Sequence, residues 1–165
     1  MRAAILITDP QNVRNTWPVV ARMLQVSCEE HVAIISQPAA LPPDTPVRFI
    51  EPHDELTALK DALVWSHDDP VLFMVSDFTA PSSELARYME FVRAGYDAVV
   101  PRIDGNCPEP LFAIYTQACM AHINSALASA RRSIADILDE LNVRYVGKPE
   151  VAKFGEPSAI LSRHS

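Results

Sequence analysis

The fold is indicated most clearly by the segment Pro70-Val71-Leu72-Phe73-Met74-Val75-Ser76-Asp77. Its five central apolar residues end abruptly at Ser76, and a short run that is apolar on both faces is typical of a central strand covered by helices on both sides. We expect Pro81 to open the next helix, whose apolar residues recur at one-face spacing. Asp77 therefore follows the carboxyl end of a central strand, where open α/β sheets bind their ligands.

Apolar strands alternate with amphipathic helices along the rest of the sequence. We expect further strands at 3–8, 31–36, 47–50, 97–101, 109–115 and 143–146, helices that start near Thr16, Asp54, Gln117 and Ser133, and a short helix in the tail near Pro157. Pro18 is placed in the first turn of the helix from Thr16. The alternation predicts an α/β fold: a three-layer α/β/α sandwich around a mainly parallel, Rossmann-like sheet. We expect a single domain over residues 1–165.

Composition narrows the classes of function. The net charge of −7 argues against nucleic-acid binding, and no apolar run approaches the ~20 residues of a membrane span. We therefore expect a soluble, cytoplasmic protein that binds neither membrane nor nucleic acid. Three widely spaced cysteines fit reduced thiols. None of the four glycines precedes Gly95, so the first half contains no glycine-rich phosphate loop.

Several polar residues are candidates for a site, and each has two interpretations. Asp77 either holds a divalent cation or caps a loop. Arg131, Arg132 and Ser133 stand at a helix start, where amides and cations favour a phosphate, but exposed arginines are also common on surfaces. Glu109, before Pro110, is either a ligand contact or a turn carboxylate. The sequence assigns no catalytic residue.

Three motifs, in order, resemble one family. They are Val-Ser-Asp-Phe at 75–78, Glu-Pro-Leu-Phe-Ala-Ile-Tyr at 109–115, and Arg-Arg-Ser at 131–133 with a proline-containing tail near Pro157. Their order and spacing are similar to those of the molybdenum cofactor guanylyltransferases and related nucleoside triphosphate transferases, over roughly residues 50–160. The resemblance implies a sheet of the nucleotidyltransferase type.

The resemblance also implies a chemistry. Enzymes of this family join the terminal phosphate of molybdopterin to the α-phosphate of GTP and release pyrophosphate. The aspartate that Asp77 matches holds Mg²⁺, which neutralises and orients the phosphates for in-line attack. The expected partners are thus a small phosphorylated ligand of the molybdopterin type or an assembly partner among molybdenum enzymes.

The chain departs from the family pattern in its first loop. The family has Leu-Ala-Gly-Gly, then Arg-Met-Gly and an Asp-Lys pair, whereas residues 6–15 read Leu-Ile-Thr-Asp-Pro-Gln-Asn-Val-Arg-Asn. The glycines are missing, Asp9 brings negative charge, and Pro10 lacks an amide donor. Arg14 is the cation that remains for nucleotide binding.

Three interpretations of function follow. The first is a divergent family member that has lost or weakened nucleotidyl transfer and retains binding of a molybdopterin-type ligand or partner. The second is an active, Mg²⁺-dependent nucleotidyltransferase of molybdenum cofactor biosynthesis with an altered loop. The third is a non-enzymatic interaction module whose motif matches reflect sheet packing.

Overall fold

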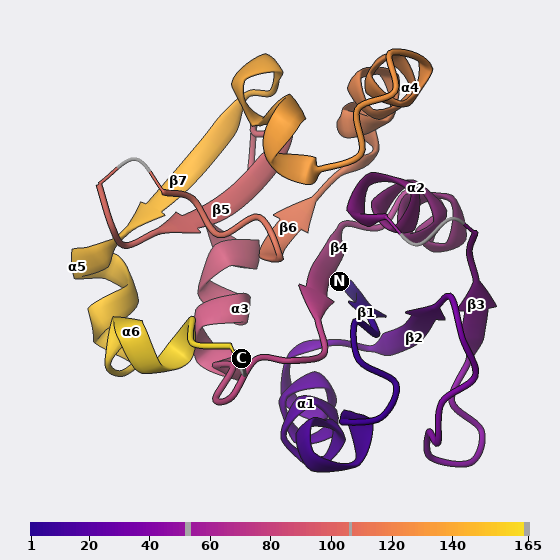
Figure 1. The fold of residues 1–165 in the computed structure, drawn as a ribbon. Coiled ribbons are helices and arrows are strands. Elements are labelled where there is room, and N and C mark those ends of the chain that lie inside the picture. The colour runs from indigo at the N-terminus through magenta and orange to yellow at the C-terminus, as the bar shows by residue number, and fades with distance from the viewer. Residues whose placement is uncertain (52–53, 106, 164–165) are drawn as a thin grey trace.

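In the part of the chain that the computed structural model describes, residues 1–51, 54–105 and 107–163, seven strands form one sheet (Figure 1). Their order across the sheet is β3-β2-β1-β4-β6-β5-β7. The strands are β1 (Arg2–Leu6), β2 (Glu30–Ile35), β3 (Val47–Phe49), β4 (Val71–Val75), β5 (Ala98–Arg102), β6 (Phe112–Tyr115) and β7 (Val143–Gly147).

The sheet is parallel except for one strand. β6 runs antiparallel to both of its neighbours: its Ala113 lies opposite Phe73 of β4, and its Ile114 lies opposite Val99 of β5. All other pairs are parallel, so the predicted mainly parallel sheet is confirmed. Because β6 is reversed, its amino end lies at the edge where β4 has its carboxyl end, and the amide of Val75 donates to the carbonyl of Leu111 (3.1 Å). The second sequence motif is thereby placed beside the first.

Helices cover both faces of the sheet. α1 and α3 pack against each other on one face, and α2 packs with α4 on the other (Figure 1). The helices are α1 (Val13–Ser27), α2 (Glu55–Ser66), α3 (Ser83–Phe91), α4 (Met120–Ala128), α5 (Lys148–Val151) and α6 (Pro157–Ile160), with 3₁₀ helices η1 (Gln117–Cys119), η2 (Ile134–Glu140) and η3 (Ala152–Phe154). This three-layer arrangement confirms the predicted fold class.

β4 is the centre of the core. All five of its residues are buried, as expected for a strand covered by helices on both faces. The ring of Phe73 meets that of Tyr115 edge-on at a centroid distance of 6.5 Å. The buried Tyr115 hydroxyl donates to the carbonyl of Pro110 (2.8 Å), which satisfies its polar group.

Two predicted helix starts are wrong. α1 begins at Val13 and not near Thr16, so Pro18 lies inside the helix and not in its first turn. The pattern of buried residues explains the earlier start: Val13 and Trp17 both pack into the core from α1, which extends the helix by one turn before the position that a proline in the first turn would indicate. Likewise Pro81 precedes α3 without opening it, since Ser82 is the N-cap and its hydroxyl accepts the amide of Leu85 (3.2 Å).

Other local predictions are confirmed. Asp54 caps α2, and Ser133 with Asp136 forms a capping box at the start of η2, although that element is a 3₁₀ helix. Cys28, Cys107 and Cys119 are free thiols. Among the described residues, no helix has the length and apolar character that a bilayer crossing requires.

Candidate functional site

A cavity of about 380 Å³ lies at the carboxyl edge of β1 and β4. Its floor is apolar, from Leu6 and Val75 at the two strand ends and from Leu111 before β6. Its walls are polar and come from the starts of α2 and η2 and from the C-terminal segment. The polar lining residues are Thr8, Asp54, Glu55, Arg132, Ser133 and Arg163.

The acidic wall of the cavity is bound within the protein. The Asp54 carboxylate accepts the amide of Thr57 (2.7 Å) and its hydroxyl (2.9 Å). One oxygen of Glu55 accepts both the Ser133 hydroxyl (3.1 Å) and the amide of Ile134 (3.2 Å). These hydrogen bonds join the start of α2 to the start of η2, which the chain separates by almost eighty residues. The candidate ligand residue Ser133 therefore lines the cavity with its hydroxyl donated to Glu55.

The two candidate arginines have different positions. Arg132 lines the cavity, where it lies 3.8 Å from Asp54 and donates to the carbonyls of Leu127 (3.2 Å) and Arg131 (2.9 Å). Arg131 does not line the cavity, and its guanidinium pairs with Glu140 instead. The structure thus brings Arg132 and Ser133 to the cavity and pairs Arg131 with the last residue of η2.

Asp77 and Glu109 lie beside the cavity. The Asp77 Oδ1 atom is buried and has no hydrogen-bond partner among the described residues. Burial raises the pKa of Glu109, and the charges of Asp77 and Glu55 raise it further, whereas Arg163 and the Leu111 amide oppose the shift. The Glu109 carboxylate accepts the Leu111 amide (3.1 Å). The antiparallel β6 thus brings these two candidates, from separate motifs, into electrostatic contact.

The donor set at Asp77 fits a hard divalent cation. A buried carboxylate oxygen without a hydrogen-bond partner is an expensive arrangement that a bound cation would relieve. Mg²⁺ is commonly held by one or two carboxylates, with substrate phosphates and waters completing its octahedron. Within the described ranges, no group of three or more His, Cys, Asp or Glu residues is arranged as a metal cage.

The loop between β1 and α1 satisfies part of its own backbone. The Asp9 carboxylate accepts the amide of Gln11 (2.9 Å), and the Asp9 carbonyl accepts that of Asn12 (3.2 Å). Pro10 has no amide, and the amide of Ile7 is in the sheet, donating to Ile34 (2.9 Å). Of the loop's own four amides, those of Gln11 and Asn12 are paired, and those of Thr8 and Asp9 have no partner in the described chain.

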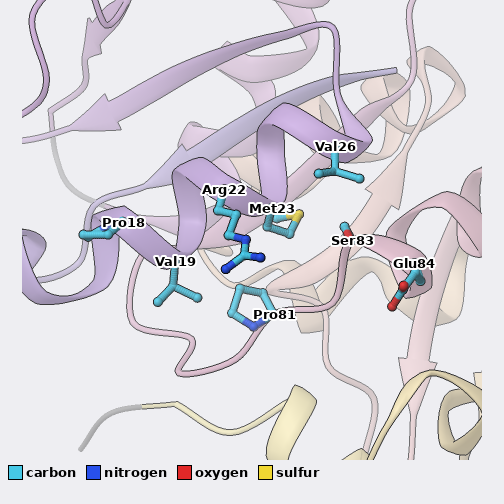
Figure 2. A pocket seen from close by; sticks show the side chains of 8 residues that line it. All are labelled: Pro18, Val19, Arg22, Met23, Val26, Pro81, Ser83 and Glu84. Atoms are coloured by element: carbon cyan, nitrogen blue, oxygen red, sulfur yellow. The ribbon is translucent and has the colours of Figure 1, made fainter.

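Arg14 lies outside the cavity. It is exposed in the first turn of α1 and lines a separate hollow of about 420 Å³ with Pro10, Gln11 and residues 38–40. A larger groove of about 680 Å³ lies between α1 and the segment that leads into α3. There Val19, Arg22 and Met23 face Pro81 (Figure 2).

Sequence reasoning did not name as site residues four of the polar residues that line the cavity, namely Thr8, Asp54, Glu55 and Arg163. The sequence places Glu55 at a capped helix start, but its role as an acceptor for η2 depends on a contact between residues distant in sequence. Arg163 follows no motif, and it reaches the site because the C-terminal segment pairs with the residues after β4. Neither contact has a local pattern that could reveal it.

A mixed sheet in this strand order, with a polar carboxyl edge, defines an α/β protein of the nucleotidyltransferase type. The chain belongs to the MobA-like NTP transferase domain family, whose sequence model matches residues 14–145, four fifths of the chain. The three motifs therefore reflect family membership and not sheet packing alone.

Curated relatives agree with this assignment. A probable molybdenum cofactor guanylyltransferase of Pelotomaculum thermopropionicum is 32% identical over 93 residues, 56% of this chain and 45% of that protein. One from Bacillus cereus is 41% identical over 56 residues, 34% of this chain and 28% of that protein. The matches thus span less than half the length of these relatives.

Solved structures share the fold at low sequence identity. Molybdopterin-guanine dinucleotide biosynthesis protein A from Archaeoglobus fulgidus superposes with a TM-score of 0.77 at 16% identity, covering 99% of this chain and 92% of that one. A Mycobacterium tuberculosis protein solved in complex with manganese gives 0.63 at 13% identity, covering 88% and 86%.

Proposed function

We propose that this chain is a MobA-like protein that binds a phosphate-bearing ligand of the molybdopterin type at the carboxyl edge, without transferring a guanylyl group from GTP. The observation that carries the proposal is the β1–α1 loop, where the Asp9 carboxylate occupies an amide that a phosphate would otherwise use. An anionic side chain seated on the loop's own donor both consumes the donor and repels triphosphate. The family match begins at Arg14, after this loop.

The starts of α2 and η2 support the same conclusion. The Leu56 amide donates to the Arg132 carbonyl (3.0 Å), and the Thr57 and Ile134 amides donate to carboxylates of Asp54 and Glu55. Helix starts bind phosphates when their first amides point at the ligand. Here protein acceptors hold those amides, so these helix starts offer few backbone donors to a nucleotide.

Side chains at the same edge suit a phosphorylated ligand. Asp77 would hold Mg²⁺, which when bound supplies positive charge that neutralises a phosphate and fixes its orientation. The apolar floor of Leu6, Val75 and Leu111 suits the flat ring of a pterin, and Arg132 and Ser133 line the wall above it. Glu109 lies close enough to Asp77 for the charge of Asp77 to raise the pKa of Glu109. The assembly partner expected from the family resemblance stays a prediction.

The experiment measures binding and transfer separately. Calorimetric titration of GTP with Mg²⁺ is expected to give no binding heat, and incubation with GTP, Mg²⁺ and molybdopterin is expected to release no pyrophosphate. Molybdopterin alone is expected to bind, more tightly with Mg²⁺ than without it. In Asp77→Asn the Mg²⁺ enhancement should disappear while binding without Mg²⁺ persists. Absence of molybdopterin binding to the unmodified chain would refute the proposal.

A second candidate is an active Mg²⁺-dependent nucleotidyltransferase. The Asp77 oxygen favours it, because the carboxylate at the end of β4 keeps an unshared acceptor where a cation would serve the transfer. Release of pyrophosphate from GTP in the presence of molybdopterin, lost in Asp77→Asn, would establish this function in place of the first.

A further inference from the structure

We propose that Arg163, in the C-terminal segment, is the residue that binds the phosphate of the ligand in the 380 Å³ cavity. This inference rests on the proposed function and adds a binding residue that lies outside the three sequence motifs and outside the matched residues 14–145. Three features of the molecule support it: the segment is anchored, the guanidinium keeps its donors, and the other charged groups of the cavity have protein partners.

The C-terminal segment is anchored directly after Asp77. The carbonyl of Ser162 accepts both the amide of Thr79 (3.0 Å) and its hydroxyl (3.2 Å), and Arg163 forms an antiparallel bridge with Phe78. In Figure 1 the yellow segment that follows α6 leads to the connection between β4 and α3. The backbone of Arg163 is therefore held at the edge of the cavity, so binding a ligand would have to order only its side chain.

The guanidinium of Arg163 keeps its donors. Its one ion pair in the described chain is with Glu109, at 3.9 Å, which is beyond hydrogen-bond distance. None of its five N–H groups donates a hydrogen bond to a described residue, and its side chain is 41% exposed. A guanidinium with a free planar fork matches two oxygens of a phosphate.

The remaining charged groups of the cavity are bound to protein partners. Asp54 and Glu55 accept two hydrogen bonds each, and Arg132 donates to two carbonyls beside Asp54. Both bonds of Arg132 leave from its Nη1 atom, so three of its N–H groups stay free, and its Nε atom lies 3.8 Å from the Asp54 carboxylate. Arg163 keeps all five N–H groups and would exchange only a loose ion pair. Arg163 is thus the lining cation that gains most from an anion.

The test titrates the full-length chain with molybdopterin and with dephosphorylated molybdopterin. Arg163→Gln is expected to weaken molybdopterin binding by about 10-fold or more, the range for one hydrogen-bonded charged group, and Arg163→Lys by less. Neither variant should alter binding of the dephosphorylated compound. Arg22→Gln, in the groove between α1 and α3, is the matched control and should bind both compounds as the unmodified chain does.

The outcomes separate the inference from the proposed function. If the unmodified chain binds molybdopterin and Arg163→Gln binds it equally, or loses both compounds equally, the inference fails and the proposed function stands. If the unmodified chain binds neither compound, both fail. An exposed ion pair contributes little to folding, so Arg163→Gln should shift the melting temperature by no more than about 3 °C.

Discussion

The contact between Glu55 and the start of η2 gives a prediction with a defined magnitude. Glu55→Ala removes an acceptor that takes both the Ser133 hydroxyl and the Ile134 amide. Hydrogen bonds to a charged group contribute about 1.5–3 kcal/mol each, but these two share one oxygen of a half-buried side chain. We therefore expect a loss of about 2–3 kcal/mol in the free energy of unfolding. For a chain of this length, that corresponds to roughly 4–12 °C in melting temperature.

Urea denaturation of three variants tests this value. Glu55→Gln keeps a neutral carbonyl acceptor and should lose about 1 kcal/mol. Glu84→Ala is the matched control, because Glu84 is also an acidic residue in the first turn of a helix but is exposed. It reports the helix-dipole contribution alone, typically below about 1 kcal/mol. If Glu55→Ala loses no more stability than Glu84→Ala, the hydrogen bonds between α2 and η2 do not stabilise the fold and the reasoning is refuted.

Three further predictions concern titration and capping. The folded-state pKa of Glu109 lies above its ordinary value of 4.5, so the free energy of unfolding should fall as pH rises from about that value through the folded pKa. Glu109→Gln should remove this fall and be more stable than the unmodified chain at neutral pH, as measured by urea titrations at several pH values. Burial raises the pKa of Cys28 to about 11 and that of Cys119 to about 12. Iodoacetamide at pH 8 should therefore modify only the exposed Cys107 in the folded protein. Rapid modification of Cys119, detected by mass spectrometry, would contradict this expectation. Asp54→Ala should cost about 1–2 kcal/mol in thermal unfolding through loss of the α2 cap.

The fold was predictable where one element carries its own signal. β4 is an unbroken apolar run, and its burial on both faces follows from composition alone. The cap at Asp54 and the capping box at Ser133 follow from local hydrogen bonding. The start of α1 did not follow, because tertiary burial of Val13 and Trp17 outweighs the local preference for proline in a first turn.

The site was predictable only in part, for the same physical reason. Asp77 and Glu109 were identified as candidates because each ends or precedes an apolar strand, and the reversal of β6 then placed them together. Arg131 and Arg132 are adjacent and equivalent in sequence, yet a pairing with Glu140 takes one away from the cavity. The direction of a side chain at a helix start depends on partners distant in sequence, and no spacing rule contains them.

The two halves of the carboxyl edge differ in how their polar groups are satisfied, and this difference argues for binding without transfer. Transfer from a triphosphate needs donors on the nucleotide side that lower the charge of the leaving pyrophosphate. There the Asp9 carboxylate accepts the Gln11 amide, and the Leu56 amide donates to a carbonyl. On the other side the Asp77 oxygen and the Arg163 guanidinium lack hydrogen-bond partners among the described residues. Folding leaves the buried Asp77 oxygen unpaired at a cost, so a ligand that brings a cation to this oxygen would return that free energy.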